Sequence, residues 1–364
     1  MHASYTDLIL PFASEPDLLD RYTNASGGIR TGKLLEHLDS LAGSISYKHV
    51  LGPGVTYDVR RSGFYIVTAA VDRLDMLAPL NPVRDLRLSG QVIYTGKSSM
   101  EVAVKMEALP MHGQEGGEEK TLMVGRFSMV CRDARTHKAR AIPGLKLETP
   151  EDEALHAIGE AHKSRRQSLA QRSLERVPPT SEEAADLHAF YLKYGNGDFH
   201  PGNGEERVWM GDTTIEKCLL MFPQERNIHQ KIFGGYLMRL AYELGFANAR
   251  LFTRAPVRFL SLDKIAFAAP VPIGSILRLR SRVLYSESSE RWPALVHIGV
   301  QANVVEPETG SETTTNDFRF TWCRDAGPPL TRKVVPQTYK DAMLWLEAKR
   351  NLEIGDELRG LRTD

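Results

Sequence analysis

Cysteine is scarce in this sequence. Only three cysteines occur among 364 residues, Cys131, Cys218 and Cys323. Three thiols spaced this widely are too few for a disulfide framework and do not form the paired spacing of a zinc site. The sequence therefore suits a reducing compartment, and because its eleven histidines are also dispersed, we expect no metal centre.

An excess of charge and a long apolar run are also missing. Lysine plus arginine and aspartate plus glutamate number 46 each, so the formal net charge is zero. Nothing in this balance argues for nucleic acid as a partner. Apolar runs such as 64–71 are far shorter than the roughly 20 residues of a membrane-spanning helix. The first residues, MHASYTD, fit neither a secretory signal nor a transit peptide.

What the sequence does contain is an internal repeat with a period of about 200 residues, long enough for one domain per repeat. Three pairs of segments recur in the same order: 29–39 with 232–242, 71–74 with 262–265, and 130–134 with 322–326. The last pair, VCRDA and WCRDA, is the most alike. Three similarities in one order indicate a duplicated domain.

Each half predicts one helix followed by an antiparallel sheet. In the first half Leu34, Leu35, Leu38 and Leu41 recur at helical spacing after a glycine. Alternating apolar and polar residues predict strands at 86–94, 100–109, 122–131, 276–285, 294–305 and 313–323. The quartets 71–74 and 262–265 open a further strand-like stretch in each half. This layout belongs to the α+β class.

A polar segment separates the halves. Residues 151–174 and 182–194 predict helices separated by a proline pair, and 195–204 is a glycine- and asparagine-rich turn region. We therefore predict three parts: an N-terminal domain at 1–147, a helical connector at 148–206 and a C-terminal domain at 207–364.

The segment 225–244, ERNIHQKIFGGYLMRLAYEL, resembles the second repeat of the mitochondrial two-domain acyl-CoA thioesterases. Segments 32–42, 89–102 and 313–321 agree, so the resemblance covers nearly the whole chain. It implies two tandem hot-dog domains, each a long helix wrapped by an antiparallel sheet. It also implies hydrolysis of fatty acyl-CoA to free fatty acid and coenzyme A at a composite inter-domain site in the mitochondrial matrix. No cofactor is expected, because coenzyme A is part of the substrate.

Only one of the two predicted helices has an acid about two turns inside it. In hot-dog thioesterases the catalytic carboxylate lies about two turns inside the helix, and the resemblance places Asp39 there. An acid among leucines is costly to bury without a task or a partner, although a solvated position or a hydrogen bond within the helix is the alternative. The second half has Tyr242 at this place, and Glu243 is turned by about 100°.

The hydrogen-bond donors are retained in the other half. Gly234 and Gly235 begin the second helix, where free N–H groups and the positive end of the helix dipole lie. Such donors stabilise the oxyanion that develops during thioester hydrolysis, and glycine lets a carbonyl oxygen approach them closely. The alternative is that both glycines serve only tight packing. Asn227 precedes them in the same motif.

One half thus keeps the acid and the other keeps the hydrogen-bond donors, which predicts one working site. We expect Asp39 of one half to act with Asn227 and Gly234 of the other. Asn24 and Glu243 leave a second, weaker site open. His229 could orient water or the substrate carbonyl, or it could simply bond to the backbone of its loop.

Contacts to coenzyme A are expected at a turn and at three basic residues. In related hot-dog enzymes a turn like Gly96-Lys97-Ser98-Ser99 touches coenzyme A, while a plain hairpin turn is the alternative. Gln91 stands where a Walker motif needs glycine. Candidates for phosphate contacts are Lys97, Arg226 and Lys231. Relatives form trimers of the two-domain chain, so we expect a homo-oligomer, and a trimer in particular.

Two other functions remain open from the sequence. A hot-dog acyl-CoA hydratase or dehydratase would need a histidine paired with an acid across the site. A non-catalytic acyl-CoA sensor would use the same groove, but Asp39 and the lack of a DNA-binding segment disfavour it. The sequence contains neither a Gly-x-Ser-x-Gly elbow nor a His-Glu-x-x-His motif.

Overall fold

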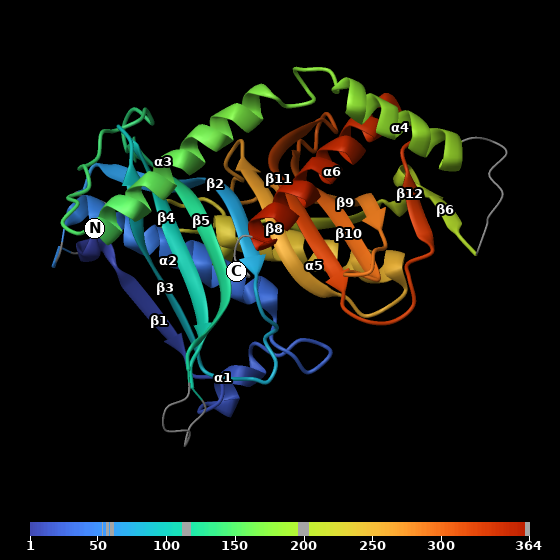
Figure 1. Cartoon of the computed structure of the whole chain (residues 1–364). Coiled ribbons are helices and arrows are strands. Elements are labelled where there is room, and N and C mark those ends of the chain that lie inside the picture. The colour runs from blue at the N-terminus through green and yellow to red at the C-terminus, as the bar shows by residue number, and fades with distance from the viewer. Residues whose placement is uncertain (53, 56–57, 59–61, 111–117, 196–203, 361–364) are drawn as a thin grey trace. The chain divides into compact units, whose positions relative to one another are not determined.

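The computed structural model describes the chain except for residues 53, 56–57, 59–61, 111–117, 196–203 and 361–364 (Figure 1). The chain forms two compact units, and each takes segments from both halves of the sequence. The first comprises Met1–Ser164, Leu220–Leu240 and Lys264–Ser275. The second comprises Arg165–Leu219, Ala241–Asp263 and Ile276–Asp364.

In each half a long helix is followed by consecutive strands, as the duplicated layout predicts. Those of the first unit are η1 (His2–Ser4), β1 (Thr6–Leu10), α1 (Pro16–Asp20), α2 (Thr31–Leu51), β2 (Phe64–Met76), β3 (Leu86–Thr95), β4 (Ser99–Ala108), β5 (Lys120–Asp133) and η3 (Pro223–Glu225). Those of the second unit are α4 (Ser181–Tyr194), β6 (Glu206–Trp209), η2 (Met210–Thr213), β9 (Ile276–Glu287), β10 (Ala294–Val305), β11 (Glu312–Arg324), β12 (Arg332–Val335) and α6 (Tyr339–Gly360). Four elements contribute residues to both units: α3 (Pro150–Gln171), β7 (Ile215–Leu220), α5 (Gly234–Thr253) and β8 (Arg258–Phe267).

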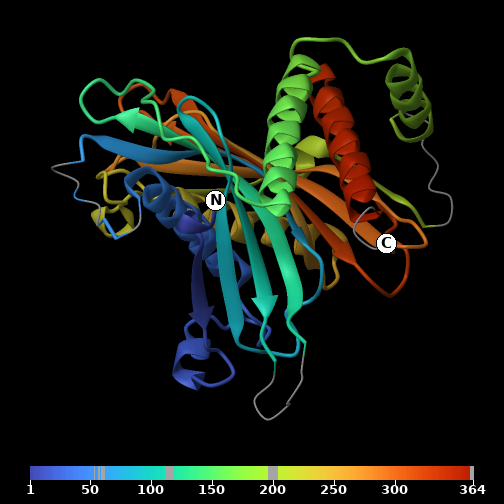
Figure 2. The ribbon, with the colours of Figure 1, turned by 60° about the vertical axis from the view of Figure 1, so that its left-hand side comes forward.

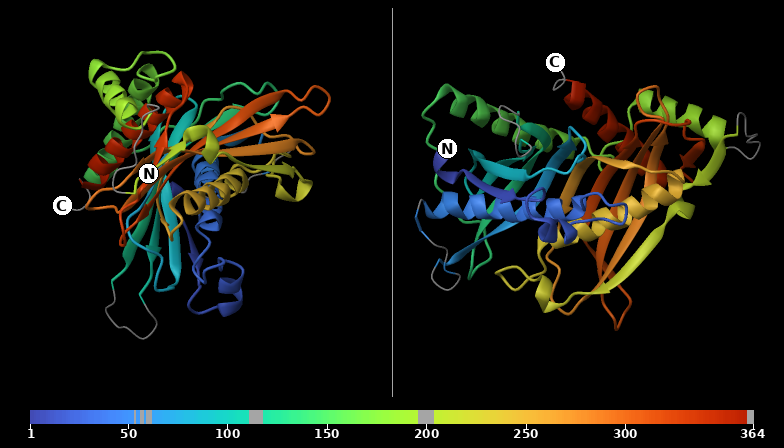
Figure 3. Two further views of the ribbon diagram at one scale, coloured as in Figure 1. Left: turned by 90° about the vertical axis from the view of Figure 1, so that its right-hand side faces the viewer. Right: turned by 90° about the horizontal axis from the view of Figure 1, so that it is seen from below.

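The first unit is a hot dog built around α2. Its strands follow the order β1-β3-β4-β5-β2, and the neighbours in this order pair antiparallel. Leu34, Leu38 and Ile45 recur at helical spacing on α2 and are fully buried, which gives the helix one apolar face for the sheet. Figure 3 (right) shows α2, in blue, running across these strands.

The opposite face of this sheet is covered by the part of α3 that belongs to the first unit (Figure 2). Gly159 of α3 packs on Tyr94 of β3, where an added Cβ would lie 2.4 Å from the Cβ of Tyr94. The Nζ of Lys163 donates a 3.3 Å hydrogen bond to the Tyr94 hydroxyl. These contacts fix α3 against the outer surface of the sheet.

The second unit repeats the plan around α5. Its strands follow the order β8-β11-β10-β9-β7, and residues 241–253 of α5 lie on one face (Figure 3, left). An added Cβ on Gly245 would lie 2.6 Å from the ring of Trp322 in β11, so glycine allows this close packing. On the other face Leu352 of α6 packs in one apolar cluster with Leu260, Leu295 and Cys323.

The predicted α+β class with tandem hot-dog domains is confirmed. The strands expected at 86–94 and 294–305 are β3 and β10, and the helix expected at 182–194 is α4. One expectation was wrong: the quartets 71–74 and 262–265 lie inside β2 and β8 and do not open them. β2 begins earlier because the apolar run 64–71 also pairs with β5.

The predicted domain boundaries remain a prediction. Within the predicted connector, residues 148–164 belong to the first compact unit and 165–206 to the second. Most of the turn region expected at 195–204 lies outside the described residues. Among the helices that the structure describes, none is both long and apolar enough to cross a membrane.

Candidate active site

Asp39 is a buried acid whose hydrogen bonds come from two other elements of the first unit. It lies on α2, and its residue is only 3% exposed. The Thr68 hydroxyl of β2 donates a 2.8 Å hydrogen bond to Oδ1 of Asp39. The backbone N–H of Gly235, at the start of α5, donates another to the carboxylate. The polar requirements of this buried acid are therefore met by β2 and α5.

Burial changes the acidity of this carboxyl. It raises the pKa of Asp39 from 3.8 to about 6, because the charged form loses its hydration. The bonds from Thr68 and Gly235 lower the same pKa, and the negative charge of Glu36 raises it further. A group with a pKa near neutrality is partly ionised at physiological pH and is suited to take up a proton.

Two glycines bring the amino end of α5 close to this acid. An added Cβ on Gly234 would lie 3.2 Å from Oδ2 of Asp39. On Gly235 it would lie 2.6 Å from the Phe233 ring and 3.0 Å from the Cα of Glu36. Larger residues would therefore press α5 away from α2. The same close contact therefore packs the two helices tightly and brings the amino end of α5 next to the acid.

An ion pair joins the same two helices beside the acid. Arg239 of α5 lies 3.0 Å from a carboxylate oxygen of Glu36 of α2. Their side chains are 19% and 23% exposed, so the pair is partly shielded from solvent. Because the positive charge of Arg239 offsets the negative charge of Glu36, it limits how far Glu36 raises the pKa of Asp39.

The loop before α5 is organised by Asn227. Its Oδ1 accepts hydrogen bonds from the backbone N–H groups of His229, at 2.9 Å, and Lys231, at 3.2 Å. Gln230 between them has a positive φ of 58°. Asn227 therefore closes a tight loop, and in this arrangement its amide oxygen serves the backbone.

The loop before α2 has the same hydrogen-bond pattern. Oδ1 of Asn24 accepts from the N–H groups of Ser26, at 2.9 Å, and Gly28, at 3.0 Å. The two loops align Asn24 with Asn227, and the same spacing then aligns Asp39 with Tyr242. The structure thus gives the sequence repeat its register, with an acid in one half and a tyrosine in the other.

In the second unit the position equivalent to Asp39 lies among aromatic side chains. Tyr242 is 9% exposed. Its ring centroid lies 5.2 Å from that of Phe259, 6.0 Å from that of Phe320 and 5.8 Å from that of Trp322. Glu243, the next residue, is half-buried and belongs to the same unit. The place that holds the acid in the first unit is part of an apolar core in the second.

His229 contacts a residue further along α2. Its Nε2 lies 2.6 Å from the hydroxyl of Tyr47, and Tyr47 follows Asp39 by about 12 Å along the helix axis. The ring centroid of Tyr65 lies 5.2 Å from that of His229. Burial lowers the pKa of His229 below 6.5, which favours the neutral ring at physiological pH.

The predicted coenzyme A turn is the β3–β4 connection. The Gly96 N–H donates a 2.7 Å bond to the Ser99 carbonyl, and the Ser98 carbonyl accepts one of 2.9 Å from Cys131 N–H. Lys97 is exposed. Arg226 and Lys231 are also exposed and lie in the loop before α5; Arg226 donates a 2.9 Å bond to the Pro223 carbonyl.

Several contacts of the site were not predicted from the sequence. Thr68 lies in a strand rich in apolar residues, Tyr47 in a helix with many other polar residues, and Glu36 and Arg239 in different repeats. Thr68 and Tyr47 belong to no recognisable motif, and Glu36 and Arg239 lie in segments that carry the family resemblance but were given no role there. The only sequence signal for Tyr47 is its position two turns after Asp39, which places the two side chains on neighbouring parts of one helix surface.

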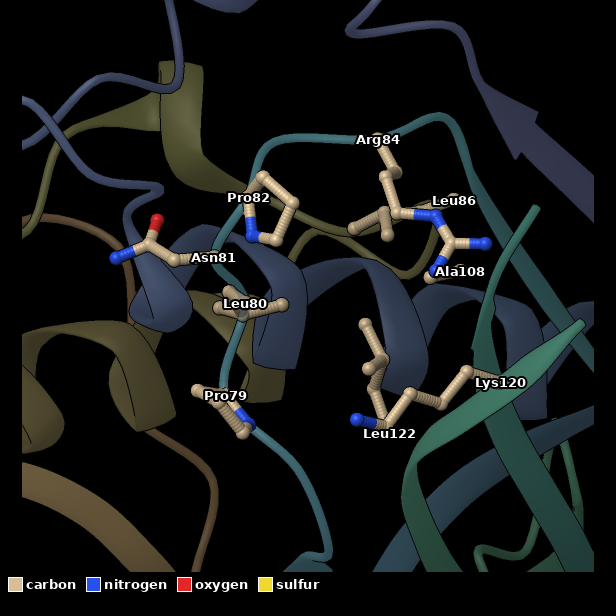
Figure 4. Close-up of a pocket in the computed structure, with 9 residues that line it drawn as sticks. All are labelled: Pro79, Leu80, Asn81, Pro82, Arg84, Leu86, Ala108, Lys120 and Leu122. Atoms are coloured by element: carbon tan, nitrogen blue, oxygen red, sulfur yellow. The ribbon is translucent and has the colours of Figure 1, made fainter. Parts of the chain in front are cut away.

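Figure 4 shows a pocket in the first unit. Its lining residues are Pro79, Leu80, Asn81, Pro82, Arg84, Leu86, Ala108, Lys120 and Leu122. The guanidinium of Arg84 donates to the carbonyls of Leu109, at 2.8 Å, and Glu118, at 3.3 Å. None of the predicted site residues lines this pocket. Over the described part of the chain, no group of three or more His, Cys, Asp or Glu residues is arranged to hold a metal ion.

Comparisons with known proteins identify the relatives of this chain. No family model matches the chain. Human mitochondrial acyl-coenzyme A thioesterase 9 is 34% identical over 372 residues, which cover 100% of this chain and 80% of the human protein. The bovine protein of the same name is 34% identical over 97% of this chain and 78% of its own length. A chloroplastic acyl-coenzyme A thioesterase 2 of Humulus lupulus is 34% identical over 94% and 79%.

Solved structures share the fold. A Lactobacillus plantarum protein assigned as an oleoyl thioesterase matches 89% of this chain and 96% of its own, with a TM-score of 0.51 and 11% identity. At that identity the likeness concerns the fold alone. The sequence relatives, in contrast, match nearly the whole chain at 32% to 34% identity. The chain therefore belongs to the family of mitochondrial-type acyl-CoA thioesterases.

Proposed function

We propose that this acyl-CoA thioesterase hydrolyses its substrate at one composite site, where Asp39 of α2 meets the amino end of α5. The observation that carries the proposal is the buried Asp39 carboxyl, with a pKa of about 6 and hydrogen bonds from Thr68 and Gly235. Burying an acid costs more free energy than burying an apolar residue, so a buried acid with a shifted pKa indicates a functional role.

Asp39 acts in this proposal as the general base. Its carboxylate removes a proton from water, and the water oxygen attacks the thioester carbonyl carbon. The negative charge that develops on the carbonyl oxygen is stabilised by the dipole of α5 and by first-turn N–H groups other than that of Gly235, which donates to Asp39. The carbon–sulfur bond then breaks, the thiolate of coenzyme A takes up the proton from Asp39, and the fatty acid is released.

The assay that tests the activity measures thiol release with acyl-CoAs of graded chain length. The proposal expects stoichiometric free thiol and free acid. Loss of the enoyl absorbance of crotonyl-CoA without thiol release would instead identify a hydratase. Binding without any turnover across the chain-length series would identify a sensor.

An isotope experiment tests the role of Asp39 within this reaction. A single turnover with excess enzyme in ¹⁸O-water should place one ¹⁸O in the acid that is formed. Direct attack by the Asp39 carboxylate would instead form a mixed anhydride, and its hydrolysis at the aspartyl carbon would give a first acid with only ¹⁶O and an ¹⁸O-labelled Asp39. The general-base role requires the label from the first turnover onward.

We propose further that Lys97, Arg226 and Lys231 bind the phosphates of coenzyme A. All three cations are exposed and belong to the first unit, which also contains Asp39 and Gly235. Exposed charges are screened by salt, so the KM for acyl-CoA should rise between about 0.05 and 0.5 M salt. A KM indifferent to salt would refute these contacts.

The assembly we propose is a trimer of two-domain chains in the mitochondrial matrix. The mitochondrial location agrees with the names of the animal relatives. Light scattering should show a mass about three times the 40.7 kDa of one chain. A fully active monomer of 40.7 kDa would contradict the assembly.

A further inference from the structure

One hydroxyl group of α2 contacts both β2 and the loop that leads into α5. Tyr47 lies on α2, which also carries Asp39. Its hydroxyl accepts a 3.0 Å hydrogen bond from the N–H of Ile66 on β2, the strand that carries Thr68. The same hydroxyl lies 2.6 Å from Nε2 of His229, in the loop that leads into α5.

The two contacts constrain the hydroxyl proton. The N–H of Ile66 can only donate, so the Tyr47 oxygen accepts there, and we assign its proton to the contact with His229. Burial favours the neutral ring of His229, which offers Nε2 as an acceptor when Nδ1 carries the proton. In this assignment Tyr47 donates to His229, whose own proton lies on Nδ1.

These contacts hold His229 through both its side chain and its backbone. Its side chain accepts from Tyr47, while its backbone N–H donates a 2.9 Å hydrogen bond to Oδ1 of Asn227. Five residues later the chain enters α5 at Gly234. A displacement of this loop would therefore move the Gly235 N–H relative to the carboxylate of Asp39.

We propose that Tyr47 is a positioning residue of the thioesterase site: its hydroxyl joins α2, β2 and the loop before α5, and so holds the amino end of α5 against Asp39. This inference rests on the proposed function of Asp39. It concerns a residue about two helical turns away from the reacting atoms, so Tyr47 acts through His229 and not on the substrate.

The test is Tyr47→Phe, which keeps the ring and removes only the hydroxyl. Small displacements of reacting groups cost up to about a hundredfold in rate, and we expect kcat to fall about tenfold while KM changes less than about twofold. The matched control is Tyr65→Phe, which keeps the ring that lies beside His229 and removes only a hydroxyl that contacts His137 at 3.1 Å, so the control should keep the wild-type kcat.

The pH profile separates positioning from a merely structural role. The Gly235 N–H lowers the pKa of Asp39, as does Thr68, while Glu36 raises it and is paired with Arg239. If the α5 terminus loosens, the contribution of Gly235 weakens and the pKa of Asp39 rises. The acid limb of kcat/KM should therefore move to higher pH in Tyr47→Phe and stay in place in Tyr65→Phe.

A double-mutant cycle tests the route through His229. If Tyr47 acts through that side chain, Tyr47→Phe should have little further effect in a His229→Ala background. Fully additive losses would overturn the route. A wild-type kcat and acid limb in Tyr47→Phe would overturn the inference, while an inactive Asp39→Asn would still support the proposed function.

A measurement on the wild-type protein covers the case in which Tyr47→Phe fails to fold. Nitrogen-15 NMR of the histidine side chains distinguishes the two neutral tautomers. The inference requires an unprotonated Nε2 on His229 near neutral pH. A protonated Nε2 would overturn it.

Discussion

The hydroxyl of Thr68 donates a 2.8 Å hydrogen bond to Oδ1 of Asp39, a carboxylate that is only 3% exposed. Thr68 belongs to a strand and Asp39 to the helix that the strand wraps. The bond therefore connects the two layers of the first hot-dog unit at the acid itself. It also favours the charged form of a carboxyl that burial would otherwise keep neutral.

Thr68→Val should raise the pKa of Asp39 above about 6. Hydrogen bonds to charged groups contribute about 1.5–3 kcal/mol, which corresponds to about one to two pKa units. The acid limb of the pH profile of kcat/KM should move upward by that amount, and activity at pH 7 should fall. Thr68→Ser keeps the hydroxyl and serves as the control. If the acid limb of Thr68→Val stays at its wild-type pH, the hydrogen bond from Thr68 does not set the pKa of the catalytic group.

The fold was predictable from the sequence because its signals are local and repeated. Strand alternation located β3 and β10, and helical spacing located α2. α6 was not predicted, although it spans 22 residues, because its apolar residues form no clear stripe. It packs through Leu352 against Leu260 and Leu295, which lie far away in the sequence.

The site was predictable only where a motif marks it. Asp39 and the pair Gly234 and Gly235 stand in recognisable places, and the structure brings them together within one unit. Thr68 and Tyr47 were missed, because a hydrogen bond between a strand and a helix leaves no pattern in a single sequence. Whether Asn227 and His229 take part in catalysis remains a prediction.

Gly235→Ala should reduce activity without unfolding the protein. The added Cβ would lie 2.6 Å from the Phe233 ring and 3.0 Å from the Cα of Glu36, so the amino end of α5 must shift. We expect kcat to fall by about tenfold to a hundredfold. The matched control is Gly43→Ala on α2, which meets no heavy atom within 4 Å.

Gly43→Ala should keep full activity and gain up to about 1 kcal/mol of stability, because alanine favours helix more than glycine does. Both variants are compared by kcat and by thermal melting. Equal kcat for Gly235→Ala and Gly43→Ala would show that the α5 terminus tolerates displacement, against the proposed site.

Glu243→Gln should cost far less activity than Asp39→Asn. Glu243 follows Tyr242, whose ring lies in the aromatic core of the second unit, so the equivalent of Asp39 there is not an acid. We expect at least half of the wild-type kcat for Glu243→Gln in the thiol-release assay. Comparable losses in the two variants would indicate a second working site.

Asp39→Asn should stabilise the protein at neutral pH. Folding raises the pKa of Asp39 from 3.8 to about 6. Between these values the unfolded chain ionises while the folded chain keeps its proton, so Asp39 lowers stability progressively as pH rises from about 4 to about 6. Above about pH 6 the resulting decrease in the free energy of unfolding is at most about 3 kcal/mol.

The amide cannot ionise, so this loss disappears in the variant. The difference in unfolding free energy between Asp39→Asn and wild type should be larger at pH 7.5 than at pH 4, and should favour the variant at pH 7.5. A difference that does not depend on pH would argue against a raised pKa in the folded protein.

The most direct test of the central claim is the kcat of Asp39→Asn in the thiol-release assay. The substitution removes the base with almost no change in volume, and loss of a general base costs about two to four orders of magnitude. Circular dichroism and acyl-CoA binding serve as controls for folding and for the substrate site. We predict a folded, substrate-binding protein with at most about 1% of the wild-type kcat. Retention of more than half of the wild-type kcat would contradict the assignment of Asp39.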